Sequence, residues 1–258
     1  MKENKPFTHQ EVKSANRRYF DLSAAFYEQV DGRRGAGLAV YLDRRLAALA
    51  APAGGGNFLD LGCGTGFVAA RAGRFFPRVT GVDISPRILS EASRRHPAAG
   101  FIAADSDALP FSAGTFNAVA GLALLHHLYD HRHTFAEVFR VLKPGGIFYT
   151  DHDLERRFRS VFHLPLLFYR LIRGEERRYG RACPQLTGRL YRATEIHREG
   201  LDPGRLGGEL KAAGFRRVEI SCHWLGLSPA FDRIGRLFNR QGRFPRGLAP
   251  SFSLWAVK

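Results

Sequence analysis

Cysteine is scarce in this sequence, and long apolar runs are missing. The 258 residues include three cysteines, Cys63, Cys183 and Cys222, and none of them belongs to a Cys-x-x-Cys pair. An odd number of cysteines at these spacings excludes a disulfide framework and a zinc ribbon, and it indicates a reducing compartment. No apolar run reaches the length of a membrane span, and the first residues lack the apolar core of a signal peptide. The sequence therefore predicts a cytoplasmic protein.

Acidic residues are also few relative to basic ones. Lys and Arg number 39 against 24 Asp and Glu, which gives a formal net charge of +15, and 33 of the basic residues are Arg. Such an excess suits anionic partners such as phosphates, carboxylates, nucleic acids and acidic membrane surfaces. A preference for Arg codons produces the same bias, so the charge alone names no partner. The apolar fraction of 45% excludes disordered and collagen-like classes.

The order of the expected elements is that of an α/β protein. Apolar residues recur at helical spacing over residues 10–50, and Pro52 with the glycines after it is expected to end this helical segment. Short apolar and β-branched runs then alternate with helical patterns, which predicts βαβ units and a parallel sheet. The expected strands are residues 57–61, 78–82, 101–104, 116–121, 147–150, 217–223 and 251–257, and the expected helices between them are 67–76, 86–95, 135–142 and 203–213.

Acidic side chains stand at the ends of four of these strands. They are Asp60, Asp83, Asp105 and Asp151, and Gly121 ends a fifth strand. Open α/β sheets bind ligands at the carboxyl ends of their strands. We therefore expect these residues to surround a pocket.

A glycine-rich turn, DLGCGTG at residues 60–66, follows the first strand and opens a helix. Phe67 stands where a dinucleotide fingerprint requires its third glycine, and the lysine of a phosphate-binding P-loop is absent. An acid ahead of the turn repels pyrophosphate and attracts an ammonium group. Asp83 is placed to accept from two ribose hydroxyls, and Asp105 from an exocyclic amine. Together these features predict a ligand with an ammonium, a ribose and an adenine but no phosphate.

The sequence contains six motifs in order, which are residues 58–66 (FLDLGCGTG), 79–85 (VTGVDIS), 104–111 (ADSDALPF), 116–119 (FNAV), 125–128 (LHHL) and 140–146 (RVLKPGG). Together they resemble the class I S-adenosylmethionine-dependent methyltransferases, in particular the small-molecule group of the ubiquinone and menaquinone type. The resemblance covers residues 16–151 well and residues 202–258 loosely. Asn117 departs from it, because an acid is common there, but Asn117 lies near the start of its strand and we expect no loss of binding.

The resemblance implies S-adenosylmethionine as cofactor and S-adenosylhomocysteine as product. Asp60, the glycine turn and the end of the fourth strand would hold the methionine part, and Asp83 would bind the ribose. Ile84 would pack on the adenine, and Asp105 with the serine after it would contact the edge of that ring. The implied cofactor-binding residues are Tyr27, Asp60, Gly62, Cys63, Gly64, Asp83, Ile84, Asp105, Ser106, Gly121 and Leu122.

The resemblance also implies the architecture. It is a doubly wound, seven-stranded, mostly parallel sheet, the Rossmann-like methyltransferase fold, with an N-terminal helical lid and an inserted helical cap. The expected division is a lid over residues 1–53, a cofactor-binding α/β core over 54–151 and 202–258, and a basic cap over 152–201.

Several side chains near the strand ends are candidates for acid–base chemistry. Methyl transfer from a sulfonium requires orientation, and it requires a base only where the acceptor must lose a proton. The candidates are His126, His127, Asp151, His152 and Asp153. We predict catalytic roles for His127 and His152. A packed structural imidazole is the alternative for His127; for His152, whose acidic neighbours would raise its basicity, the alternative is a loop cluster that binds arginines.

No metal site is expected from these donors, because they include no pair of histidines at i and i+4. Cys63 lies in the glycine turn, where the resembled family commonly has cysteine. A reactive thiol at this position is the weaker interpretation.

The acceptor is not named by a motif. Residues 158–173 combine large apolar side chains with arginines, which fits a surface on an anionic membrane, an apolar roof over a pocket, or an ordinary buried pair of cap helices. Residues 231–246 place arginines between phenylalanines, a pattern that also suits nucleic acid.

We therefore predict a methyltransferase of small, apolar or anionic acceptors, lipid- or quinone-like, with O- and C-methylation as alternatives. Peripheral contact with an anionic membrane is a further expectation. RNA or protein is the second choice of substrate, and the other alternative is a catalytically silent protein that binds S-adenosylmethionine and acts on a partner.

Overall fold

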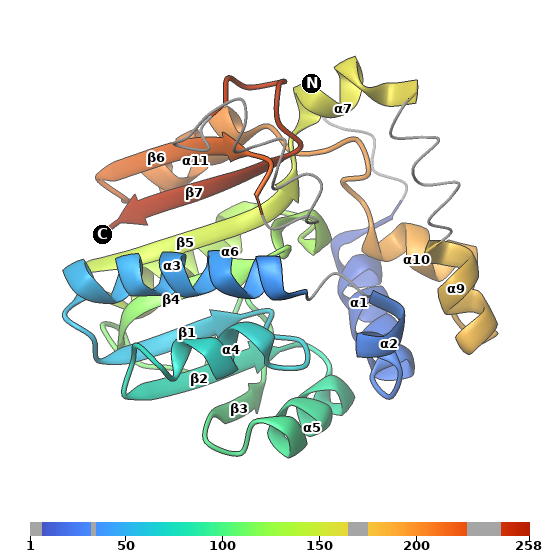
Figure 1. Cartoon of the computed structure of the whole chain (residues 1–258), viewed down its shortest axis with the longest axis horizontal. Helices are drawn as coiled ribbons and strands as arrows, with labels where there is room; N and C mark the ends of the chain where they lie inside the picture. Colours follow the sequence, from blue (N-terminus) through green and yellow to red (C-terminus); the bar gives the residue numbers. More distant parts are fainter. Residues whose placement is uncertain (1–6, 32–34, 165–174, 226–243) are drawn as a thin grey trace.

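One seven-stranded sheet organises the part of the chain that the computed structural model describes, residues 7–31, 35–164, 175–225 and 244–258. Its strand order is β3-β2-β1-β4-β5-β7-β6 (Figure 1). The strands are β1 (Asn57–Leu61), β2 (Arg78–Asp83), β3 (Gly100–Ala103), β4 (Phe116–Leu122), β5 (Leu142–Leu154), β6 (Arg217–His223) and β7 (Ser251–Val257). Strands β1 to β5 pair in parallel, whereas β7 is antiparallel to both neighbours. The predicted α/β class with a mostly parallel sheet is confirmed.

Helices cover both faces of this sheet. The helices of the described residues, including those that do not lie on the sheet, are α1 (His9–Ser23), α2 (Tyr27–Asp31), α3 (Ala36–Ala53), α4 (Phe67–Ala72), α5 (Pro86–Arg95), α6 (His131–Val141), α7 (Arg156–Val161), α9 (Glu175–Ala182), α10 (Gly188–Thr194) and α11 (Pro203–Ala212), with a 3-10 turn η1 (Leu125–His127). Among the described helices, none combines the length and apolar character needed to cross a membrane.

Two apolar clusters fill the space between the sheet and its helices. On one face, α3 presents a row of buried leucines three and four residues apart, which pack with Phe58 of β1 and Val68 of α4. On the other face, Phe135 of α6 and Leu210 of α11 are fully buried and pack with Phe148 of β5. The sheet is therefore doubly wound, as predicted.

The N-terminal helices and the helices of residues 175–194 lie together beyond the carboxyl ends of the parallel strands (Figure 1). Helix α10 packs against α1, and α9 packs against α2. A third apolar cluster joins them, with Tyr19 of α1, Tyr179 of α9 and Leu186 buried in it. The predicted lid and the predicted cap are thus in contact with each other. Their separation from the core as units remains a prediction.

Element boundaries differ from the sequence expectation in several places. Helix α4 ends at Ala72 rather than at residue 76, and α6 begins at His131 rather than at residue 135. The helical segment of residues 10–50 is three helices, and the last of these, α3, packs on the sheet. Strand β5 is longer at both ends than the expected 147–150, because Leu142 pairs with β4 and Leu154 pairs with β7. Helix α3 continues through Pro52 to Ala53, and Gly54, with a φ of 68°, caps it.

Two stretches singled out in the sequence are only partly covered. Residues 165–173 of the apolar segment 158–173 and residues 231–243 of the basic stretch 231–246 lie outside the described residues.

Asn117 joins three segments near the start of β4, away from the carboxyl end of the strand, as the sequence predicted. Its Oδ1 accepts from the backbone N–H of Asn57 and from Lys143 Nζ, both at 3.0 Å. Its Nδ2 donates to the carbonyl oxygen of Ala53 at 3.1 Å. One amide side chain therefore ties the end of α3 and the start of β1 to β4.

Asn117→Ala should lower the free energy of unfolding by about 1–3 kcal/mol, because it leaves the N–H of Asn57 and the carbonyl of Ala53 without this partner. Asn117→Asp keeps the acceptor and loses only the donor, so its loss should be smaller. Urea denaturation of the parent and both variants measures these differences. An alanine variant as stable as the parent would contradict the assignment.

Candidate functional site

The glycine-rich turn between β1 and α4 has a left-handed backbone. Gly62 and Gly64 have φ angles of 68° and 53°, a region that side chains disfavour. A Cβ on Gly62 would lie 2.6 Å from Leu124 Cδ1. The N–H of Gly64 donates to Asp83 Oδ2 at 3.0 Å. The turn therefore requires glycine at these positions and is tied to the end of β2.

Asp83 is buried where β2 ends. Its Oδ1 accepts from the N–H of Ser85 at 3.0 Å, and Ser85 caps the first turn of α5. Burial raises the pKa of Asp83, although the N–H donors of Ser85 and Gly64 act in the opposite direction. One carboxylate thus connects the glycine turn to the start of α5.

A cavity of about 200 Å³ opens at the carboxyl ends of the strands, between the sheet and α1. The predicted site residues that line it are Tyr27, Gly62, Gly64, Asp83, Ile84, Asp105, Ser106, Leu122, His127 and His152. It is also lined by polar residues that the predicted site did not include, namely His9, Lys13, Asn16, Asp107, His126, Tyr129 and Asp130. The wall contributed by α1 was missed, because the sequence shows α1 only as an amphipathic helix and not which side chains face a pocket.

Three predicted cofactor residues lie behind the lining. Asp60 is buried, and its Oδ2 accepts from the N–H of Ala69 in α4 at 2.8 Å. Cys63 is buried, and a Cβ on Gly81 of β2 would lie 2.8 Å from its Sγ. Gly121 leaves no room for a side chain, since a Cβ there would lie 2.9 Å from Leu124 Cδ2. These residues shape the turn and strand end that carry the lining.

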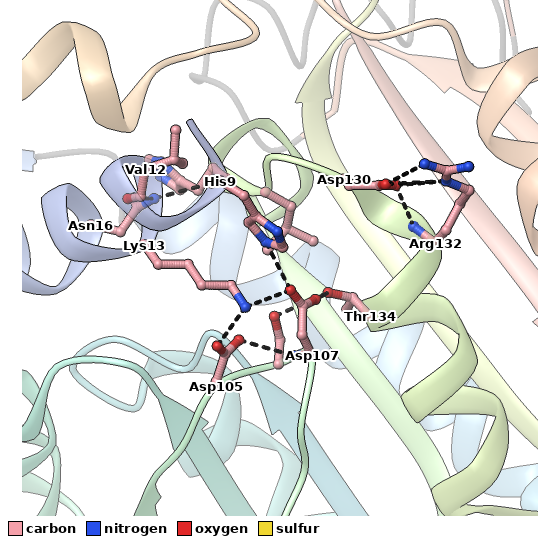
Figure 2. A network of polar contacts seen from close by, with 12 residues as sticks. His9, Val12, Lys13, Asn16, Asp105, Asp107, Asp130, Arg132 and Thr134 are labelled. Atoms are coloured by element: carbon pink, nitrogen blue, oxygen red, sulfur yellow. Dashed lines mark hydrogen bonds and ion pairs between the residues drawn. The ribbon is translucent and has the colours of Figure 1, made fainter. Parts of the chain in front are cut away.

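Lys13 of α1 joins the N-terminal helix to the loop after β3 (Figure 2). Its Nζ lies 2.6 Å from Asp105 Oδ2 and 2.7 Å from Asp107 Oδ2. His9 Nε2 lies 3.0 Å from the same oxygen of Asp107, and Thr134 Oγ1 donates to the other at 2.6 Å. Burial alone would raise the pKa of Asp107, but Lys13 and Thr134 outweigh burial and lower it. Two carboxylates therefore anchor α1 over this end of the pocket.

The two histidines of η1 have fixed tautomers. His126 Nδ1 lies 2.7 Å from Asp153 Oδ1, and Asp153 is fully buried. His127 Nδ1 donates to the carbonyl oxygen of Thr194 at 2.9 Å. Burial and the neighbouring His126 lower the pKa of His127 to about 4, so its ring is neutral at pH 7. The His127 ring therefore keeps its proton on Nδ1 and can accept at Nε2, whereas His126 Nε2 lies 3.6 Å from Glu195 Oε1.

His152 has a strained backbone at the edge of the pocket. Its φ of 66° lies in the left-handed region, as does the φ of 51° of Ala123, and both residues line the cavity. Within the described part of the chain, His152 Nε2 makes no hydrogen bond. The Nδ1 atom lies 3.1 Å from Asp151 Oδ1. From the sequence, we expected both neighbouring acids to act on His152. In the structure Asp153 pairs with His126 instead, because β5 shifts register between Thr150 and Asp153.

Asp151 is the centre of a buried polar network. It is fully buried and accepts from the hydroxyl of Tyr41 at 2.6 Å and from the hydroxyl of Tyr149. His223 Nε2 lies 2.7 Å from its Oδ1. Burial works to raise the pKa of Asp151, but His223 and His152 outweigh burial and hold that pKa well below its usual range. Asp151 was predicted to lie at the carboxyl ends of the strands, where the ligand binds. In the structure its hydrogen bonds instead stabilise the end of β5 next to His152.

Asp151→Asn should lower the free energy of unfolding at pH 7 by about 1–3 kcal/mol, because an amide offers fewer acceptors to the buried donors of Tyr41, Tyr149 and the His152 backbone. The pKa of Asp151 is depressed in the folded state, so its contribution is present above the ordinary value of 3.8 and is lost as the pH falls below it. Denaturation curves at pH 7 and in steps below pH 4 should show that the difference in free energy of unfolding between parent and variant becomes smaller as the pH falls. A difference that stays constant would contradict the assigned role of Asp151.

Comparison with known proteins gives one family match. Residues 59–150 match the model of a family described as "Methyltransferase domain". A ubiquinone/menaquinone biosynthesis C-methyltransferase of Desulfotalea psychrophila is 40% identical over 131 residues, covering 49% of this chain and 53% of that protein. The O-methyltransferase cnsE of Penicillium expansum is 36% identical over 143 residues, covering 49% and 52%. The chain thus spans about half the length of the curated relatives it matches.

Among solved structures, the chain is similar to a phosphoethanolamine N-methyltransferase of Haemonchus contortus in complex with S-adenosyl-L-methionine. The TM-score is 0.62 at 17% identity, covering 98% of this chain and 60% of that one. At this identity the similarity supports the fold.

Proposed function

We propose that this chain transfers a methyl group from S-adenosylmethionine to a small acceptor and releases S-adenosylhomocysteine, since residues 59–150 match the model of a family described as a methyltransferase domain. The acceptor is apolar or anionic, and the transfer is to oxygen or carbon. The observation that carries the proposal is the position of Asp83. Its Oδ2 accepts from the N–H of Gly64 in the glycine turn at 3.0 Å, and Asp83 and Asp105 line the same cavity.

In the proposed pose, the ribose hydroxyls donate to Asp83, which ends β2 as in nucleotide-binding sheets. The adenine amine donates to Asp105, beside Ser106, and Ile84 packs on the ring; all three line the cavity. The carboxylates of Asp83, Asp105 and Asp107 line the cavity. A wall with carboxylates suits a cofactor that carries a sulfonium and an ammonium and has no phosphate.

The methionine part is proposed to follow Gly62, Gly64 and Leu122 on the cavity wall, with Tyr27 of α2 opposite them. The backbone of the turn can approach a ligand closely because two of these residues have no side chain. Asp60, buried behind the turn and bonded to α4, supports its shape.

The reaction is an in-line displacement in which the acceptor atom forms a bond to the methyl carbon and the electron pair of the C–S bond stays on sulfur. Orientation supplies most of the acceleration. Where the acceptor loses a proton, we assign that proton to the imidazole of His152, a residue of the cavity wall. His127, which has a neutral ring and lines the same cavity, is proposed to orient the acceptor.

Apolar side chains on the cavity wall support a hydrophobic acceptor. They include Phe20, Leu38, Leu124 and Leu128. The cap also has an exposed apolar edge, since Val161 and Leu164 are 68% and 73% exposed. This edge, next to the arginines of α7, supports the proposal of peripheral contact with an anionic membrane.

Asp83→Asn should weaken S-adenosylmethionine binding about 10- to 100-fold, because a hydrogen bond to a charged group contributes about 1.5–3 kcal/mol. Isothermal titration calorimetry with the parent and the variant measures the effect. Asp43→Asn is the matched control, since Asp43 pairs with Arg71 and Arg74 on the outside of α3 and α4. Equal affinities of parent and Asp83→Asn would contradict the proposed ribose contact.

His152→Ala should lower the transfer rate about 10²- to 10⁴-fold for an acceptor that must lose a proton. Its affinity for S-adenosylmethionine should match that of the parent, because His152 is not part of the proposed cofactor contacts. Single-turnover rates with saturating cofactor separate the two quantities. A variant that turns over at the parental rate would reject His152 as the base.

The class of acceptor is tested by incubating the protein with methyl-labelled S-adenosylmethionine and a cell extract, then separating lipids, small molecules, RNA and protein. Label in the lipid or small-molecule fraction is the expected result. Label in RNA or protein would overturn the proposed substrate and favour the arginine-rich surfaces as its binding site. Cofactor binding without any labelled product, across several extracts, would favour a catalytically silent partner protein.

A further inference from the structure

Two histidines and a glutamate lie close together beside the pocket. His126 and His127 belong to the turn η1, and Glu195 directly follows the last residue of α10. One nitrogen or oxygen atom from each lies within 4.8 Å of the others, and His126 Nε2 is 3.6 Å from Glu195 Oε1. His126 and His127 also line the cavity.

The hydrogen bonds behind the rings favour metal binding. His126 Nδ1 donates to the buried carboxylate of Asp153, and His127 Nδ1 donates to the carbonyl oxygen of Thr194. Metal-ligating histidines nearly always donate their second N–H to a carboxylate or a backbone carbonyl, which fixes the tautomer and the ring orientation. Both supports are present here, one of each kind.

We propose that His126 Nε2, His127 Nε2 and the Glu195 carboxylate bind one divalent transition-metal cation of the Zn²⁺ class. Two imidazoles and a carboxylate are a ligand set of catalytic zinc sites and of Fe²⁺ sites, and they disfavour Mg²⁺ and Ca²⁺, which prefer oxygen. No metal was expected from the sequence, because the candidate donors include no pair of histidines at i and i+4. The turn of His126 and His127 is 3-10 rather than α-helical, and the third ligand comes from residue 195, which no local spacing could reveal.

Three protein ligands leave at least one coordination position for a water molecule or an oxygen of a bound small molecule. A cation bound there lowers the pKa of that oxygen. This consequence for an acceptor hydroxyl rests on the proposed function, whereas cation binding itself does not.

The test is a Co²⁺ titration of the full, tag-free chain after treatment with EDTA, followed by visible absorption. The expected result is an intense absorption band of low-coordinate Co²⁺ that saturates at one cation per chain and disappears when Zn²⁺ displaces it. Glu195→Gln should weaken Co²⁺ binding at least tenfold, and Asp153→Asn should weaken it about 10- to 100-fold. Glu199→Gln is the matched control, because Glu199 is 72% exposed and pairs only with Arg159 among the described contacts, at 2.7 Å.

S-adenosylmethionine binding by each protein, measured by calorimetry without metal, shows that the pocket of each variant is intact. Absence of the Co²⁺ band in the parent would overturn the metal site, and so would a Glu195→Gln variant with parental Co²⁺ affinity. Cobalt binding by a parent protein that fails to bind S-adenosylmethionine would contradict the proposed function and leave the metal site supported.

Discussion

The hydrogen bonds of one buried carboxylate, that of Asp83, hold together the part of the molecule on which the pocket depends. Asp83 accepts from the N–H of Gly64 in the left-handed glycine turn after β1 and from the N–H of Ser85, the N-cap residue of α5, after β2. These two loops are far apart in the sequence, yet parallel pairing brings both to the same edge of the sheet. A shorter side chain at this position would leave the turn unsupported, and a neutral one would weaken its hold on two N–H donors. The floor of the cavity is built on this contact.

The net charge of the chain gives a poor picture of the pocket. The whole sequence carries +15, but the cavity wall includes the carboxylates of Asp83, Asp105, Asp107 and Asp130. The arginines lie mainly in other parts of the chain, where they pair with surface acids such as Asp43 and Glu199. Electrostatic steering of a ligand depends on the local field in a cleft rather than on the total. The charge balance inside the cleft therefore differs from that of the whole chain, although Lys13 pairs with Asp105 and Asp107 and Arg132 pairs with Asp130.

Sequence patterns predicted the order of the elements and the glycine turn, because alternation and spacing are local properties. They did not predict the partners of Asp151, His152 and Asp153. Three neighbours in a strand have different surroundings here, since the register of β5 shifts between Thr150 and Asp153, and the partner of Asp153 is 27 residues away. The ion pair of Lys13 with Asp105 was missed for the same reason, as it joins an N-terminal helix to the loop after the third strand. Side-chain pairings between distant segments follow from packing, which no single-sequence period encodes.

The apolar cluster of Tyr19, Tyr179 and Leu186 has a kinetic consequence. It fastens the N-terminal helices to α9 and α10, while Lys13 fastens the same α1 to the two carboxylates beside the pocket. Helix α1 cannot swing outward alone without stripping aromatic surface from α10, so the cheaper movement carries both together. Opening this wall of the cavity would then require α1 and α10 to move as one unit.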